Sequence, residues 1–348
     1  MSQLVFSENI PLAPFTTMSV GGPARYFMEA ATENDIREAI EFTKKNSMPI
    51  FFFSGGSNIV VSDSGFDGLV VRIAVKGREF VQLSGEIVEV RAGAGENWDS
   101  FVADVVKEEL WGIECLSGIP GSVGGTPIQN VGAYGQEVSE TITEVVCLEL
   151  ASGEIKCIPN SECGFSYRKS CFNSTDSGKF VVLHVRFRLR KNGTPNLRYP
   201  EIATKLSDKN PNILEIRNTI LDIRRSKAMV FDPTDPNSRS AGSFFKNPIV
   251  SVDESQRLQD LIPGLPVFPA EDGFVKVPAA KLIEAAGFKR GYRLGNAGIS
   301  ERHSLAITNR GGATAKEIVS LARLIRGEVA ERFNILLTPE PVFVGIEL

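Results

Sequence analysis

The chain has 348 residues, which is long enough for about two or three domains. Hydrophobic residues make up 42% and charged residues 23%, the composition of an ordinary soluble globular protein. The net charge of −4 argues against a general nucleic-acid-binding protein. Because the sequence contains no long uninterrupted apolar run, no membrane span is expected.

The N-terminus and the cysteines favour a cytoplasmic protein. Residues 1–15 lack a basic start followed by an apolar stretch, so no signal peptide is expected. The five cysteines include no CxxC pair and the chain has only two histidines, so no metal site is predicted. Reduced thiols in a cytoplasmic protein are the simplest interpretation.

Short strands and two helices are predicted in the first part of the chain. Apolar residues recur at spacings of three and four over residues 33–46, which predicts a helix with Thr32 as its N-cap. A second helix is predicted over residues 97–109, where Trp98 and Phe101 share an apolar face that packs in the core. Apolar or alternating runs predict strands at 25–30, 49–53, 59–61, 68–73 and 87–91.

A loop of small residues, SGGSN at 54–58, lies between two of these strands. The backbone N–H groups of such a loop can line a phosphate pocket. It is not a Walker loop, because no Gly-Lys-Ser/Thr follows. A plain tight turn explains the same residues equally well.

Residues 113–137, here called the glycine loop, are the most unusual stretch of the sequence. Seven glycines fall from Gly112 to Gly135 without a helical or strand period. Glycine allows positive φ and lets main-chain N–H groups approach a ligand, so we expect this backbone to fold closely around one. Apolar residues such as Ile119 and Val123 argue against disorder. A long surface loop with ordinary turn glycines is the alternative.

Two charged residues are candidates for chemistry. Arg168 lies in a connection between predicted strands, and its planar fork suits a carboxylate, although a solvated surface arginine is the simpler interpretation. Glu340 lies between two prolines in an apolar run, and a buried acid there suggests a functional site. A solvent-facing glutamate on an edge strand is the alternative for Glu340.

The second half of the chain continues to mix strands and helices. A shift toward Asn, Pro and Lys over residues 192–212 could mark a domain boundary, and residues 229–239 are predicted as a loop. The other predicted elements are a hairpin of 145–150 and 154–158, strands over 180–189 and 305–308, and helices over 213–227, 277–287 and 314–334.

Eight segments together resemble one family, the bacterial UDP-N-acetylenolpyruvoylglucosamine reductases. The resemblance runs from about Thr16 to the C-terminus, and it is specific because of the order and combination of the segments. The segments are TTMSVGGPA at 16–24, SGGSN at 54–58, GAGENW at 93–98, SGIPGSVGGTPIQNVGAYGQE from Ser117, GFSYRKS at 164–170, RRSK at 224–227, SAGSFFKNP from Ser240, and the terminal LTPEP.

The resemblance implies an α+β fold in which a two-subdomain FAD-binding fold of the vanillyl-alcohol-oxidase/PCMH type precedes a smaller α+β substrate-binding domain. The expected divisions are 1–75 and 76–212 for the two FAD-binding subdomains and 213–348 for the substrate domain, with the strand that carries Glu340 returning to the flavin site. FAD is expected to bind non-covalently, through its pyrophosphate at 54–58 and its isoalloxazine along 119–134. The implied cofactor-binding residues are Ser54, Gly55, Gly56, Ser57, Asn58, Ile119, Pro120, Gly121, Ser122, Gly124, Gly125, Gln129, Asn130, Gly132, Ala133 and Tyr134.

The resemblance also implies a reaction. NADPH reduces FAD, and hydride then passes from flavin N5 to the enolpyruvyl ether of UDP-N-acetylglucosamine, which gives UDP-N-acetylmuramate for peptidoglycan synthesis. Arg168 and Glu340 are expected to stabilise the enolate, and Ser243 to protonate it. The implied substrate-binding residues are Tyr134, Arg168, Tyr199, Lys227, Asn247 and His303, the last standing where some members have glutamine. We expect a monomer without a nucleic-acid or membrane partner.

Two other functions remain open at this stage. The chain could be another FAD oxidoreductase of the same flavin fold, such as an alcohol or lactone oxidase. Many of those hold FAD covalently through His or Cys; His184 and His303 lie outside the glycine loop, but Cys115 lies within it. Alternatively, a non-catalytic nucleotide-sugar-binding protein would need neither a flavin nor Ser243.

Overall fold

The computed structural model describes residues 6–206 and 210–348, and the chain forms two compact units. The first unit contains the described residues up to Ile10, then Ala24–Gly56 and Phe66–Val230. The second contains Pro11–Pro23, Ser57–Gly65 and Phe231–Leu348. Among the described residues, none of the helices has the length and apolar character that crossing a membrane requires, and no group of three metal-ligating side chains occurs.

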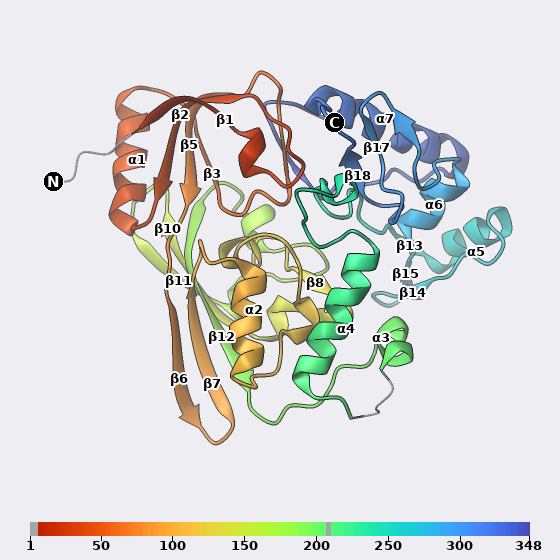
Figure 1. Cartoon of the computed structure of the whole chain (residues 1–348), viewed down its shortest axis with the longest axis horizontal. Coiled ribbons are helices and arrows are strands. Elements are labelled where there is room, and N and C mark those ends of the chain that lie inside the picture. The colour runs from red at the N-terminus through yellow and green to blue at the C-terminus, as the bar shows by residue number, and fades with distance from the viewer. Residues whose placement is uncertain (1–5, 207–209) are drawn as a thin grey trace. The chain divides into compact units, whose positions relative to one another are not determined.

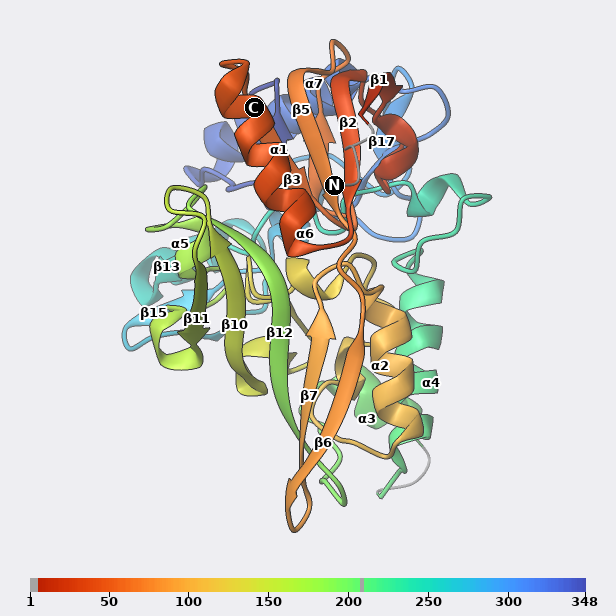
Figure 2. The same ribbon diagram turned by 90° about the vertical axis from the view of Figure 1, so that its left-hand side faces the viewer.

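Two sheets make up most of the first unit (Figures 1 and 2). Their strands are β1 Ser7–Pro11, β2 Pro23–Ala30, β3 Ile50–Phe53, β5 Phe66–Ile73, β6 Arg78–Ser84, β7 Ile87–Gly93, β10 Ile142–Glu149, β11 Ile155–Pro159 and β12 Phe180–Arg190. The smaller sheet has the order β1-β2-β5-β3, with β5 parallel to both β2 and β3. The larger sheet is antiparallel and has the order β11-β10-β12-β7-β6.

The described part of the first unit contains four α-helices: α1 Glu33–Lys45, α2 Trp98–Lys107, α3 Pro200–Lys205 and α4 Ile213–Ser226. Helix α1 begins at the predicted N-cap, since the Thr32 side chain accepts a hydrogen bond from the Asp35 N–H. Helix α2 buries Trp98 and Phe101, whose rings lie 6.1 and 5.2 Å from the ring of Phe187 on β12. The predicted apolar face of α2 is therefore confirmed as core packing.

An ion pair joins α2 to α4, which lie next to each other in Figure 2. Arg217 on α4 donates to both carboxylate oxygens of Asp99 on α2, at 2.7 and 3.0 Å. Asp99 also accepts a hydrogen bond of 2.6 Å from the Gly118 N–H. The beginning of the glycine loop is thus fixed to both helices.

The second unit consists of short strands and three helices. The elements are β4 Ile59–Val61, β13 Ile249–Ser251, α5 Val252–Leu261, β14 Phe268–Pro269, β15 Phe274–Lys276, α6 Ala279–Ala285, β16 Arg293–Leu294, β17 Ala297–Ile299, β18 Ile307–Asn309, α7 Ala315–Phe333 and β19 Val342–Val344. Helix α7 packs against β17, β18 and α6 (Figure 1). Its N-cap is Thr314, whose side chain accepts a hydrogen bond from the Glu317 N–H, and it ends at Asn334, which is left-handed with φ 56°. Strand β19 runs parallel to β4.

The predicted order of helices and strands is confirmed for most of the chain, with small shifts at the ends of elements. Strand β18 begins at Ile307 instead of Leu305, and residues 229–239 are a loop that contains one short 3₁₀ turn. The sequence did not predict β1, β6, α3 or α5, nor the short strands β13 to β17 and β19 of the second unit. The division at 75 and 212 remains a prediction; within the two observed units, α4 and residues up to Val230 belong with the first.

Candidate functional site

Two loops of the first unit touch through bare backbone. A Cβ atom added to Gly55 would lie 2.5 Å from the Gly121 Cα, so only glycine fits this approach. A Cβ on Gly124 would lie 2.5 Å from the Ala94 Cβ. The predicted small-residue loop and the glycine loop are therefore packed together, as a shared binding surface requires.

The middle of the glycine loop is held against the start of α2. The Trp98 N–H donates to the Gly121 carbonyl oxygen at 3.1 Å, and the Gly124 N–H donates to the Ala94 carbonyl oxygen at 2.9 Å. Between them, the Val123 N–H donates to Glu96 at 2.9 Å. These bonds make the loop a fixed backbone surface instead of a loose connection.

Several polar groups on this surface have no partner. Within the described residues, no hydrogen bond uses the N–H groups of Gly55, Gly121 or Ser122. The Ser122 hydroxyl is buried and also lacks a partner there. Gly125 is exposed, and a Cβ on it would meet only the Ser122 Oγ, at 3.8 Å. Gly55 is exposed and Gly121 is partly buried, but Ser122 is buried, and an unpaired buried donor is costly. This arrangement fits a bound group with oxygen or nitrogen acceptors, as FAD has.

The second half of the glycine loop contains β8 Gly132–Ala133 and β9 Gln136–Glu137. Asn130, predicted to bind the cofactor, has φ 44° and is almost fully buried. Its amide donates to Glu137 Oε2 at 2.7 Å and lies 3.2 Å from the Ser166 carbonyl oxygen, and its Oδ1 accepts from the Ser139 N–H. In this structure the Asn130 side chain therefore fixes the fold of the glycine loop through hydrogen bonds to other protein groups.

Arg168 lies beside the glycine loop. It occupies a left-handed position (φ 55°) in the turn of residues 166–169. Its Nη2 donates to the Gly132 carbonyl oxygen at 2.8 Å, and the following Ser170 hydroxyl donates to Ile128 at 2.6 Å. Arg168 is half-buried and anchored, so the solvated-surface alternative does not describe it.

Three predicted substrate residues lie close together in the first unit. The rings of Tyr134 and Tyr199 meet edge to face with centroids 5.2 Å apart. Lys227, at the end of α4, pairs with Glu201 in the first turn of α3. Burial raises the pKa of the Tyr134 hydroxyl, although a hydrogen bond with Arg224 opposes the shift. The hydroxyl therefore stays protonated and able to donate a hydrogen bond.

Cys115 is a poor candidate for a covalent flavin link. It is buried in the glycine loop, and burial, together with the adjacent Glu114, raises the pKa of its thiol. The thiol is therefore held in its unreactive protonated form.

Ser243 and Glu340 lie on paired segments of the second unit. The Glu340 N–H donates to the carbonyl oxygen of Phe244, the residue after Ser243, at 2.9 Å. The Lys246 N–H donates to Thr338 at 2.9 Å, and Phe245 forms a β-bridge with Pro339. Segments that are almost 100 residues apart in sequence thus run side by side.

Asn58 fixes the Glu340 segment from its other side. Its side-chain amide donates to the Glu340 carbonyl oxygen at 3.1 Å, and its own carbonyl oxygen accepts from the Val342 N–H at 2.9 Å. The N-terminal motif joins this arrangement, because the Thr17 hydroxyl donates to the Ser240 carbonyl oxygen at 2.7 Å. Four of the motifs quoted from the sequence therefore meet in the second unit.

The other two substrate candidates also lie in the second unit. The Asn247 Oδ1 accepts from the Ala279 N–H at 2.9 Å, at the start of α6. The His303 Nδ1 accepts from the Leu305 N–H at 3.1 Å. Arg168 belongs to the first unit, so the convergence of Arg168 with Ser243 and Glu340 remains a prediction.

Comparisons with known proteins agree with both halves of this description. Residues 24–157 match the FAD binding domain family, and residues 233–344 match the C-terminal domain of UDP-N-acetylenolpyruvoylglucosamine reductase. These matches, with the mixed helices and strands, confirm the predicted α+β flavin fold.

Curated relatives match along nearly the whole chain. The UDP-N-acetylenolpyruvoylglucosamine reductase of Thermobifida fusca is 44% identical and covers 99% of both chains. That of Mycobacterium leprae is 42% identical over 98% of this chain and 96% of its own. The crystal structure of UDP-N-acetylenolpyruvylglucosamine reductase from Thermus caldophilus has a TM-score of 0.68 and 26% identity, and covers 98% of this chain and 100% of its own. The chain therefore belongs to the UDP-N-acetylenolpyruvoylglucosamine reductase family and is an oxidoreductase with an FAD-binding domain.

Proposed function

We propose that this protein reduces the enolpyruvyl ether of UDP-N-acetylglucosamine to UDP-N-acetylmuramate, with NADPH as the source of electrons. The observation that carries the proposal is the pairing of the Ser243 and Glu340 segments, in a chain that is 44% identical to a curated reductase over 99% of its length. It would act in peptidoglycan precursor synthesis, in the cytoplasm and as a monomer.

The cofactor would be held by the backbone surface of Gly55, Gly121 and Ser122. Their unpaired N–H groups and the Ser122 hydroxyl supply donors without bulky side chains, which suits phosphate oxygens and the polar edge of a flavin. Bound FAD supplies the two-electron chemistry, accepting hydride from NADPH and passing it to the substrate. No covalent link is proposed, in agreement with the buried, protonated Cys115.

Arg168 and Glu340 would act on the charge that develops during reduction. Hydride addition to the methylene carbon leaves negative charge on the neighbouring carbon and its carboxylate, as an enolate. The guanidinium of Arg168 is suited to that carboxylate, and Glu340 would complete the stabilisation from the second unit. Because this charge is larger in the transition state than in bound substrate, stabilising it accelerates the reaction.

Ser243 would donate the proton that completes the reduction. A serine hydroxyl is a weak acid, so it can serve only an acceptor as basic as an enolate carbon. Gly242 immediately before it has φ 73°, a conformation that L residues rarely adopt, and this sets the direction in which the chain enters Ser243.

The nucleotide sugar would bind through Tyr134, Tyr199 and Lys227 in the first unit and through Asn247 and His303 in the second. Lys227 is paired with Glu201, so a phosphate group would compete with that carboxylate for the ammonium group. Tyr199 is 40% exposed and thus accessible to a ligand.

An anaerobic half-reaction experiment tests the proposal. The purified protein should be yellow, should lose its flavin absorbance on addition of NADPH, and should regain it when the enolpyruvyl nucleotide sugar is added without oxygen. An alcohol or lactone oxidase would be reoxidised by oxygen but not by this substrate. A non-catalytic binding protein would show no flavin absorbance.

A further inference from the structure

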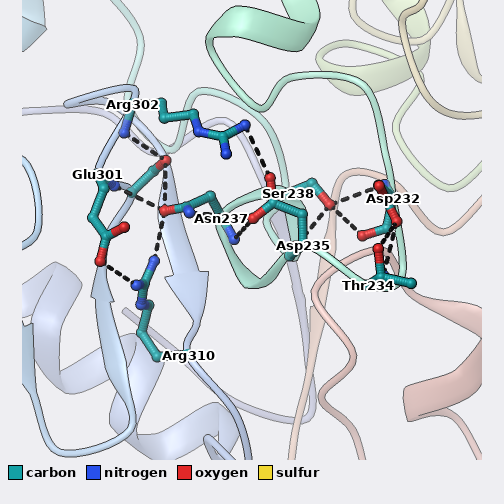
Figure 3. Close-up of polar contacts among 9 residues, drawn as sticks. Asp232, Thr234, Asp235, Asn237, Ser238, Glu301, Arg302 and Arg310 are labelled. Carbon is teal, nitrogen blue, oxygen red and sulfur yellow. Dashed lines mark hydrogen bonds and ion pairs between the residues drawn. The ribbon is translucent and has the colours of Figure 1, made fainter.

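The loop before Ser243 is an ordered structure with its own hydrogen bonds (Figure 3). Asp232 Oδ1 accepts from the Thr234 N–H at 2.8 Å, and the Asp232 N–H donates to the Ser238 hydroxyl at 2.9 Å. The Ser238 Oγ also lies 2.7 Å from the Asp232 carbonyl oxygen. Residues 232–238, here called the 232–238 loop, are therefore closed on themselves.

Asn237 joins this loop to residues that directly follow the strands β17 and β18 (Figure 3). Its Oδ1 accepts from Arg310 Nη1 at 2.6 Å and from the Glu301 N–H at 2.9 Å, and Ser300 Oγ lies 3.4 Å away. Its amide nitrogen donates to Asp235 Oδ1 at 3.2 Å. Asn237 is only 7% exposed. A buried amide that uses both ends fixes the position of its backbone more strictly than packing alone.

Arg310 is the strongest partner in this cluster. Its side chain is 9% exposed, and its second nitrogen, Nη2, pairs with Glu301. Charge-assisted hydrogen bonds are about twice as strong as neutral ones, so the bond to Asn237 should dominate. Arg302 forms a neighbouring ion pair with Asp235, but the Arg302 side chain is 47% exposed. Exposed ion pairs contribute little to stability.

A continuous series of contacts leads from Asn237 to Ser243. The Asn309 N–H donates to the Arg239 carbonyl oxygen at 3.0 Å, and Ser240 forms a β-bridge with Thr308. Beyond Ser243, the Phe244 N–H donates to Leu305 at 2.8 Å. Ser243 thus lies on a segment attached on both sides to β18 and the residues before it, and Asn237 is the side-chain anchor at its N-terminal end.

We propose that Asn237, held by Arg310, is a positioning residue for Ser243, and that it determines the rate of proton donation without affecting reduction by NADPH. The inference rests on the proposed function. The selective effect on proton donation distinguishes this role from a purely structural one. If Asn237 were only structural, its loss would lower the flavin content and slow both half-reactions together.

Three variants in the complete FAD-loaded protein test the inference. Asn237→Ala removes the anchor. Asn237→Asp keeps the acceptor that Arg310, Glu301 and Ser300 use, but it loses the donor to Asp235. Thr234→Ala is the matched control, since Thr234 lies in the same loop and its hydroxyl donates to Asp232. Stopped-flow absorbance measures flavin reduction by NADPH and reoxidation by the enolpyruvyl nucleotide sugar, in H₂O and in D₂O.

In Asn237→Ala, NADPH should reduce the flavin at a rate within about twofold of the wild type. Reoxidation of the flavin by the substrate should slow by about 10- to 100-fold, as expected when a reacting group is misplaced by about 1 Å. Its solvent isotope effect should rise, because proton transfer becomes more rate-limiting. Asn237→Asp should recover only part of the rate, because it keeps the acceptor for Arg310 but places a carboxylate oxygen where the amide donates to Asp235. Thr234→Ala should match the wild type in both half-reactions. If Asn237→Ala does not fold, Arg310→Lys is used in its place, because one ammonium group cannot hold Asn237 and Glu301 in the same geometry. Arg310→Lys should show the same selective slowing of flavin reoxidation.

The outcomes separate the two proposals. If the wild-type protein is not reoxidised by the enolpyruvyl nucleotide sugar, the proposed function is wrong and the role of Asn237 falls with it. If the wild type is active but the Asn237→Ala or Arg310→Lys protein slows equally in both half-reactions, or in neither, only the role of Asn237 is wrong. A solvent isotope effect on reoxidation that is unchanged in Asn237→Ala would also show that the proposed role of Asn237 is wrong.

Discussion

The Glu340 N–H donates a 2.9 Å hydrogen bond to the carbonyl oxygen of Phe244, next to Ser243. The proposed proton donor and the proposed stabilising acid therefore move as one piece of backbone. Pro339 and Pro341 stiffen the Glu340 side of the pair, and Gly242 sets the turn on the Ser243 side. This rigidity matters because a reacting group must already be in place when charge develops on the substrate.

Replacing Glu340 by glutamine should impair turnover while preserving substrate binding. The amide has nearly the same shape and leaves the backbone bonds to Phe244 and Asn58 intact, but it cannot carry the charge or the proton of a carboxyl group. We expect reoxidation of the reduced flavin to slow by about 100-fold or more. Stopped-flow reoxidation at saturating substrate measures this, and an unchanged rate would remove Glu340 from the site.

The Ser243→Ala variant should separate the two half-reactions. Reduction by NADPH requires no proton from Ser243, so its rate should stay close to that of the wild type. Reoxidation by the enolpyruvyl substrate should fall by about 10² to 10⁴, the usual contribution of a general acid. Ser251→Ala, which removes only the N-cap of α5, is the control and should alter neither rate. Equal losses in the two half-reactions of Ser243→Ala would refute the acid role.

Elements with an apolar face could be predicted from the sequence, and elements without one could not. Helices α1 and α7 show apolar stripes, and α1 shows an N-cap at Thr32, all of which the structure confirms. Helix α5 buries only Ser255 and Leu258, so it has no apolar stripe to recognise. Strand β6 is exposed along most of its length, because it forms the edge of its sheet.

Local sequence patterns could not predict which residues contact one another within the site. Glycine spacing indicated a backbone that approaches something closely, but nothing in it identified Gly55 as the neighbour of Gly121. Asn237 lies in a turn-rich segment where asparagine is common for local reasons, and its partner Arg310 is 73 residues away. Pairing at such separations is decided by the tertiary fold.

Gly55→Ala should lower the FAD content of the protein. The new methyl group would lie 2.5 Å from the Gly121 Cα, so the two loops must separate and the cofactor surface is lost. Gly327→Ala is a matched control, because that glycine lies inside α7 with open space around its Cβ position. The control should keep its flavin and gain about 1 kcal/mol in unfolding free energy through helix propensity. Flavin-to-protein absorbance ratios measure the effect, and full FAD content in Gly55→Ala would contradict the close approach.

Ser122→Ala should weaken FAD binding without destabilising the apo-protein. In the absence of FAD, the buried hydroxyl has no partner among the described residues, so removing it should leave the stability of the apo-protein unchanged or raise it by about 1 kcal/mol. If the hydroxyl binds FAD, the dissociation constant for FAD should rise by about tenfold. Urea denaturation of apo-protein and fluorescence titration with FAD give the two quantities. A destabilised apo-protein with normal FAD affinity would show that Ser122 has a structural role.

The Asp99–Arg217 pair should make the stability of the first unit depend on pH. Burial alone would raise the pKa of the Asp99 carboxyl, but hydrogen bonds from Arg217 and the Gly118 N–H outweigh it, and the pKa lies below its ordinary value of 3.8. A carboxyl with a lowered folded-state pKa stabilises the protein above its ordinary pKa, and this contribution is lost as pH falls through the lowered value.

Asp99→Asn should therefore lower the unfolding free energy at neutral pH by about 1–2 kcal/mol, a figure reduced for the partial exposure of the Asp99 side chain. Below the folded-state pKa the wild-type carboxyl is itself protonated, so the difference between the two proteins should shrink. Asp104→Asn on the same helix is the control; its side chain is 50% exposed, and the change should stay within about 1 kcal/mol at either pH. Urea denaturation of both variants at neutral and acidic pH measures these differences. An Asp99→Asn deficit that persists undiminished into acid would mean that packing, and not the charge on Asp99, holds α2, α4 and the glycine loop together.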